Sequence, residues 1–217
     1  AVWDNPLSTF SIDVDNASYS NVRRFLTQYH ELPPPDAVRI EELINYFSYD
    51  YPQPRGEHPF ALVTEVAQCP WNPEHQLLHL GIQGKSLDYE QLSPSNLVFL
   101  VDVSGSMDEP NKLPLVQKSL RLLINALQPT DRVAMVVYAG AAGLVLPSTV
   151  ASDKETIFKA LENLQAGGST AGGAVIQLAF LFANENFISD GNNRVIFATD
   201  GDFNIGTSST GDLVRMI

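Results

Sequence analysis

The stretch NLVFLVD at residues 96–102 is a run of apolar side chains that ends in an acid. Such a run is typical of a strand that is buried on both faces, as in a parallel sheet. Two further strands and one short strand are expected at 131–138, 194–199 and 143–146. Apolar residues at helical spacing lie between them, at 113–127, 152–164 and 171–187. Strands that alternate with helices in this way predict an α/β doubly wound sheet that is mostly parallel.

Residues 1–95 differ from this pattern and are richer in proline and tyrosine. The elements expected there are a short strand at 9–14, helices at 16–29 and 36–47, and strands at 60–66 and 77–82. Asp36 is the expected N-cap of the second helix, and Ser152 is expected to open a capping box later in the chain. We therefore expect an α+β extension over residues 1–95 and an α/β domain over residues 96–217.

Composition excludes several classes of function. The 217 residues include 13 Lys and Arg against 25 Asp and Glu, which gives a net charge of −12. Phosphate binding needs basic side chains, so a nucleic-acid partner is not expected. No apolar run approaches the ~18 residues of a membrane-spanning helix. The single cysteine, Cys69, excludes an internal disulfide and a cysteine-based zinc site. An acidic chain does suit a site that attracts cations.

Three loops are expected at the edge where the predicted strands have their carboxyl ends, at 102–106, 168–170 and 199–201. Ligands of open parallel sheets bind at the carboxyl ends of the strands, so we expect these loops to meet. Their side chains offer carboxylate and hydroxyl oxygens, which are the ligands that hard divalent cations prefer. Gly105 is expected to let the first loop bend. The sequence therefore predicts a divalent-cation site at this edge.

The three loops carry a recognisable pattern. The sequence D-x-S-x-S at 102–106, a threonine in the glycine-rich loop at 170 and T-D-G at 199–201 resemble the metal-ion-dependent adhesion site of the von Willebrand factor A family. The resemblance covers residues 96–217 and implies a Rossmann-like fold. A domain of this family has six sheet strands and a final helix, whereas this sequence ends within a helix expected from Asp212. The resemblance therefore implies a C-terminally incomplete domain, or one that another chain or segment completes.

The resemblance also implies a role for each matching residue. Ser104, Ser106 and Thr170 would bind the metal directly, and Asp102 and Asp200 would bind it directly or through water. One coordination position would be left for an Asp or Glu of a protein partner. The implied function is a non-enzymatic, divalent-metal-dependent protein-binding module for adhesion or scaffolding. Mg²⁺ is the expected cation, with Mn²⁺ and Ca²⁺ as alternatives.

The N-terminal extension resembles that of the bacterial YfbK-like A-domain family, on FSIDVD at 10–15 and NVRRFL at 21–26. Proteins of this type are often envelope-associated. The resemblance therefore implies the bacterial cell envelope, either periplasmic or lipoprotein-anchored, while a cytoplasmic location stays open.

Two other functions stay open. Asp13 and Asp15 mimic an aspartyl phosphotransferase motif, in which the first Asp is the nucleophile and the second the general acid or base. The same two acids are also explained as caps at the end of a strand. The Asp102 loop is a weaker phosphotransfer candidate, because Ser104 stands where the general acid would be. The other alternative is a scaffold whose metal site is not used.

Overall fold

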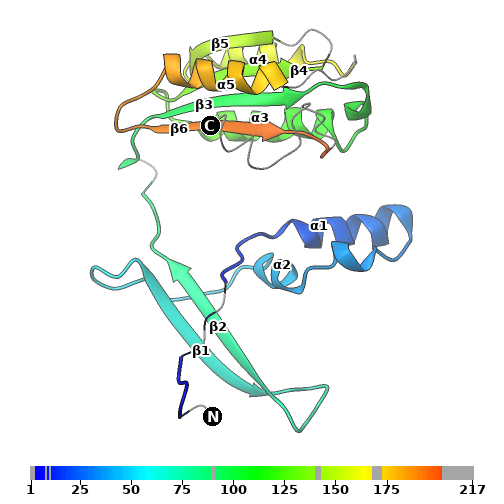
Figure 1. The fold of residues 1–217 in the computed structure, drawn as a ribbon, viewed down its shortest axis with the longest axis vertical. Coiled ribbons are helices and arrows are strands. Elements are labelled where there is room, and N and C mark those ends of the chain that lie inside the picture. The colour runs from blue at the N-terminus through cyan, green and yellow to red at the C-terminus, as the bar shows by residue number, and fades with distance from the viewer. Residues whose placement is uncertain are drawn as a thin grey trace. The chain divides into compact units, whose positions relative to one another are not determined.

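The computed structural model describes residues 3–7, 9, 11–88, 91–139, 143–167 and 173–201. Contacts divide the chain into two compact units, Ala1–Ser86 and Leu87–Ile217. The two units are built differently: the first consists of helices and a hairpin, and the second is a layered α/β domain (Figure 1).

The second unit is organised around a four-stranded sheet in the order β5-β4-β3-β6. The strands are β3 (Ser95–Asp102), β4 (Arg132–Tyr138), β5 (Gly143–Val150) and β6 (Asn192–Ala198). The central strand β3 pairs in parallel with β4 and with β6, and β5 pairs antiparallel with β4. Residues 96–102 of β3 are all buried, which explains their continuous apolar run. The predicted α/β fold with a mostly parallel sheet is confirmed.

Helices cover both faces of this sheet (Figure 1). They are α3 (Leu113–Ala126), α4 (Lys154–Glu162) and α5 (Gly173–Glu185). Successive side chains of a strand point to opposite faces. Phe99 of β3 accordingly belongs to the core that includes Ile124 of α3 and Ile157 of α4. Leu100, the next residue, belongs to the core that includes Ile176 of α5.

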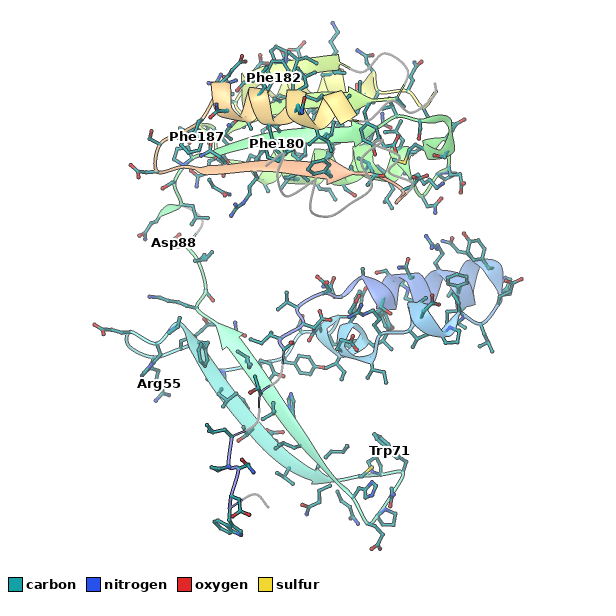
Figure 2. All side chains as sticks on the ribbon, in the orientation of Figure 1. Arg55, Trp71, Asp88, Phe180, Phe182 and Phe187 are labelled. Carbon is teal, nitrogen blue, oxygen red and sulfur yellow. The ribbon has the colours of Figure 1, made fainter. Side chains whose placement is uncertain are left out.

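The first unit combines two short helices with a long hairpin. The helices are α1 (Ala17–Arg24) and α2 (Ile40–Asn45), with a π-helical turn at Phe25–Tyr29 and a 3₁₀ turn at Pro35–Ala37. The buried Glu42 of α2 accepts a hydrogen bond from the backbone N–H of Ser18 in α1, at 2.9 Å. The hairpin pairs β1 (Phe60–Gln68) with β2 (Gln76–Gly84), and Trp71 lies at its turn (Figure 2).

Two expectations for the first unit are wrong. Of the strand expected at 9–14, the described residues 9 and 11–14 form none; the Asp13 side chain instead accepts the N–H of Asp15 at 2.9 Å, a local hydrogen bond that competes with strand pairing. Asp36 does not cap a helix that runs to residue 47. It lies inside the 3₁₀ turn, and the extended backbone of Val38 and Arg39 separates this turn from α2.

Two details of the second unit also differ from expectation. The third strand, expected at 143–146, continues to Val150 because it pairs antiparallel with most of β4. Helix α4 is capped by Asp153 rather than Ser152, since the Asp153 side chain accepts the N–H of Thr156 at 3.2 Å. The helix expected from Asp212 lies outside the described residues.

Candidate metal centre

Asp102 and Asp200 leave the sheet at the same edge. Asp102 is the last residue of β3, and β6 ends at Ala198, two residues before Asp200. The two strands are parallel neighbours with Val101 opposite Ala198. Their carboxyl ends therefore lie together, at the edge where ligands of α/β sheets bind.

The Asp102 loop folds back on itself so that its oxygens lie close together. Asp102 Oδ1 accepts the backbone N–H of Ser104 at 2.8 Å. The hydroxyl oxygens of Ser104 and Ser106 lie 3.0 Å apart in a hydrogen bond. Asp102 and Ser104 are 1% and 7% exposed, whereas Ser106 is on the surface. The D-x-S-x-S pattern thus places one carboxylate and two hydroxyls in one connected group.

Gly105 does not have the role expected for it. Its backbone is not in the left-handed region, and a Cβ at this position would meet no atom of the described residues within 4 Å. The reason is that the loop continues as a 3₁₀ turn at Gly105–Met107, which residues other than glycine can adopt.

Tyr138 supports Asp102 and was not identified from the sequence. Its hydroxyl donates to Asp102 Oδ2 at 3.0 Å, and the Thr199 side chain also hydrogen-bonds with Tyr138. Burial raises the pKa of Tyr138 far above the ordinary tyrosine value; the Thr199 hydrogen bond lowers it, and the Asp102 carboxylate raises it further. The hydroxyl is therefore a stable donor. The sequence shows only that Tyr138 ends a predicted strand; the strand register that places it directly opposite Asp102 comes from the structure.

Lys112 is the second residue that sequence reasoning missed. Its ammonium donates to the carbonyl oxygen of Ser106 at 2.9 Å and to Asp200 Oδ2 at 3.2 Å. The hydrogen bond to Asp200 is the main cause that raises the pKa of Lys112, so the side chain is cationic at neutral pH. The lysine immediately precedes α3, and its contacts join the Asp102 loop to the loop after β6.

The loop that carries Thr170 lies outside the described residues, and so does Thr170 itself. The chain can be followed as far as Gly167, whose N–H donates to the carbonyl oxygen of Val103 at 2.7 Å. The chain thus enters the Thr170 loop directly beside the Asp102 loop.

The chemistry of the described donors fits a hard divalent cation. Within the described part of the chain, Asp102 has no basic side chain within ion-pair distance, and its charge is buried with one N–H and one hydroxyl as donors. A buried carboxylate is costly unless a positive charge compensates it. No group of three or more His, Cys, Asp or Glu side chains forms a metal cluster among the residues described. The available ligands are therefore two carboxylates and serine hydroxyls, the oxygen chemistry that Mg²⁺ and Ca²⁺ prefer.

The alternative site at Asp13 belongs to the first unit. Asp13 Oδ1 accepts the N–H of Asp15 at 2.9 Å, and Oδ2 forms an ion pair with Arg39 at 3.1 Å. Arg39 also pairs with Glu41 and Glu42. Both oxygens of the Asp13 carboxylate are therefore engaged within the unit.

Comparison with known protein families agrees with this architecture. The family described as von Willebrand factor type A domain matches residues 97–202, and a family described as von Willebrand factor matches residues 1–79. Residues 97–202 form a von Willebrand factor type A domain. A domains commonly mediate protein–protein interactions. The fold and family implied by the sequence are thus confirmed, and metal binding by the A domain stays a prediction.

Similarity to individual proteins extends over both units. Uncharacterized protein YfbK from Escherichia coli strain K12 is 47% identical over 223 residues, which cover 100% of this chain and 39% of YfbK. Human inter-alpha-trypsin inhibitor heavy chain H4 is 30% identical over 125 residues, 54% of this chain and 13% of that protein. The chain therefore spans well under half the length of these two relatives.

Solved structures also include similar domains. The conserved hypothetical protein BatB from Bacteroides thetaiotaomicron has a TM-score of 0.39 and 26% identity, over 50% of this chain and 55% of that one.

In the described part of this chain, no helix has the length and apolar character needed to cross a membrane.

Proposed function

We propose that the A domain is a non-enzymatic module that binds a protein partner through a divalent cation. Mg²⁺ is the first candidate, and Mn²⁺ and Ca²⁺ are alternatives. The residues that would hold the cation are Asp102, Ser104, Ser106, Thr170 and Asp200. The observation that carries this proposal is the buried Asp102 carboxylate beside the paired Ser104 and Ser106 hydroxyls, at the sheet edge that Asp200 shares.

The residues around Asp102 hold the proposed ligand oxygens in place. The backbone N–H of Ser104 and the Tyr138 hydroxyl fix the two oxygens of Asp102, so the carboxylate cannot rotate freely. The Ser104–Ser106 hydrogen bond holds two hydroxyl oxygens next to it. A bound cation would supply positive charge to these oxygens and an open position for a carboxylate of the partner. Specificity for acidic partner residues then follows from charge.

Calorimetric titration with Mg²⁺, Mn²⁺ and Ca²⁺ tests the cation site. We expect the wild type to bind at least one of these ions. Asp102→Ala and Asp200→Ala should weaken binding by about 100-fold or abolish it, because each removes one of two carboxylate ligands. Asp108→Ala is the matched control, since Asp108 is an exposed acid just after the same 3₁₀ turn. The proposal fails if the wild type binds none of the ions, or if all three variants bind as the wild type does.

The carboxylate of the partner needs its own test. A peptide library selected in Mg²⁺ and eluted with EDTA should yield sequences with an essential Asp or Glu. Replacing that residue by Asn or Gln removes the charge but keeps the shape, and should abolish binding. Selected peptides that bind equally well in EDTA, or as Asn and Gln versions, would contradict a metal-bridged contact.

Phosphotransfer at Asp13 is the competing function. Beryllofluoride in the presence of Mg²⁺ mimics an aspartyl phosphate, so mass spectrometry of an adduct at Asp13 or Asp102 would favour an enzyme. The engagement of both Asp13 oxygens favours the non-enzymatic proposal instead. A scaffold with an unused metal site would show no binding in the titrations above.

Two wider proposals concern the setting of the A domain. β6 lies at an edge of the described sheet, so we propose that a further chain or segment can pair with it. We also propose the bacterial cell envelope as the location, on the basis of the sequence resemblance. Detection of the protein in soluble cytoplasmic extract alone, after cell fractionation, would contradict that location.

A further inference from the structure

Lys112 binds the same carboxylate that the proposed cation needs. Its Nζ lies 3.2 Å from Asp200 Oδ2, 2.9 Å from the carbonyl oxygen of Ser106 and 3.4 Å from Glu109 Oε1. The side chains of Lys112 and Asp200 are 25% and 10% exposed, so this ion pair is partly shielded from water. The chain thus carries a positive charge of its own between two of the loops that hold predicted metal ligands.

A divalent cation and this ammonium cannot both occupy Asp200 without a cost. Like charges that share one carboxylate lie within a few ångströms of each other, and their repulsion is weakly screened where water is partly excluded. The ammonium has two other partners when it leaves Asp200, because Glu109 Oε1 and the carbonyl oxygen of Ser106 already lie next to it. Release of Lys112 from Asp200 therefore needs only a short movement of a flexible side chain.

We propose that Lys112 is a built-in competitor of the divalent cation at Asp200. In the cation-free protein it balances the charge of the Asp200 carboxylate. Cation binding breaks the Lys112–Asp200 ion pair, while Lys112 keeps its ion pair with Glu109. This inference rests on the proposed cation site. It adds that the affinity of the site is set below its maximum by the protein's own lysine. Lys112 directly precedes α3, so the exchange of its ammonium for a divalent cation at Asp200 takes place at the start of that helix.

The test compares cation binding to the 217-residue protein and three variants by calorimetry with MgCl₂ and MnCl₂. Lys112→Met removes the charge and keeps most of the side-chain length, and it should bind Mg²⁺ about tenfold more tightly than the wild type. Lys112→Arg keeps the charge and should stay closer to the wild-type affinity than Lys112→Met does. Lys118→Met is the matched control, because it removes an exposed lysine from α3 itself, and it should stay within about twofold of the wild type.

Thermal unfolding in EDTA provides a second readout that does not need the cation. Lys112→Met should unfold several degrees below Lys118→Met, because Asp200 loses its compensating charge, and saturating Mg²⁺ should close that gap. An affinity of Lys112→Met equal to or below that of the wild type overturns the competitor role while leaving the cation site intact. If Lys112→Met binds the cation and the wild type does not, the competitor role is supported in its strongest form. If neither the wild type nor any variant binds a cation, both the competitor role and the cation site are overturned.

Discussion

Tyr138 shows how a single hydroxyl can hold the candidate site in place. The hydroxyl donates to a carboxylate that is almost fully buried, and Tyr138 is itself 1% exposed. Tyr138→Phe keeps the ring and leaves Asp102 Oδ2 without this donor. We expect the free energy of unfolding to fall by about 1–3 kcal/mol, because a buried acceptor loses its hydrogen bond. Urea unfolding in EDTA measures the effect without a contribution from bound cation.

The matched control for this substitution is Tyr29→Phe. Tyr29 is half exposed in the first unit, and its ring packs against Phe25. Loss of its hydroxyl should change the free energy of unfolding by less than about 0.5 kcal/mol. Equal effects of the two substitutions would mean that the Tyr138–Asp102 hydrogen bond does not stabilise the second unit.

At the scale of residues, the sequence predicted the acids and serines of the candidate site but not the side chains that hydrogen-bond to them. Asp102 ends β3 and Ser104 and Ser106 follow it within four residues, so their proximity is local and can be predicted from spacing. Tyr138 and Lys112 reach the same place from β4 and from the residue before α3. Their roles depend on strand register and on side-chain direction, which local sequence does not encode.

Gly191 directly precedes β6, and there is no room for a side chain at this position. A Cβ there would lie 2.7 Å from the carbonyl oxygen of Pro94 and 2.6 Å from Ile188 Cγ2. The Pro94 carbonyl is itself fixed, because it accepts the N–H of Asn192 at 3.0 Å where β6 begins beside β3. Gly191→Ala should therefore lower the free energy of unfolding by about 1–3 kcal/mol, as overpacking typically does.

Gly143→Ala is the control for that prediction. Gly143 also begins a strand, β5, but a Cβ at this position would meet no atom within 4 Å in the part of the chain that the structure describes. The substitution should leave stability within about 0.5 kcal/mol of the wild type. If urea unfolding gives the two variants the same midpoint, contact with Pro94 is not what requires glycine at 191.

At the scale of elements, prediction succeeded where burial alone decides the structure. β3 and β4 are buried over nearly their whole length, so a continuous apolar run was enough to locate them. In β5 only Leu146 is buried, so an apolar run could not mark its full length, which comes from pairing with β4. Of the alternating residues at 9–14, the described ones (9 and 11–14) form no strand. Alternation permits a strand, but a strand forms only where a partner supplies hydrogen bonds.

The division of the molecule into two units leads to a prediction about which part a cation stabilises. Ala1–Ser86 and Leu87–Ile217 are separate compact units, and each has its own tertiary contacts. The proposed cation ligands all belong to the second unit. A ligand stabilises only the unit that it binds when folded, by about 2.7 kcal/mol at 100 times its Kd.

We therefore expect calorimetric scans of the protein to show two transitions, of which Mg²⁺ raises one by roughly 5–10 °C and leaves the other unchanged. Asp102→Ala, which removes a ligand from the second unit, should cancel the shift. Asp13→Ala, which removes an acid from the first unit, should leave the shift intact and lower only the other transition, because Arg39 loses an ion-pair partner. A Mg²⁺-dependent shift of both transitions, or one that Asp13→Ala abolishes, would place the cation in the first unit or couple the two units. Either result would contradict a cation site confined to the carboxyl edge of the second unit's sheet.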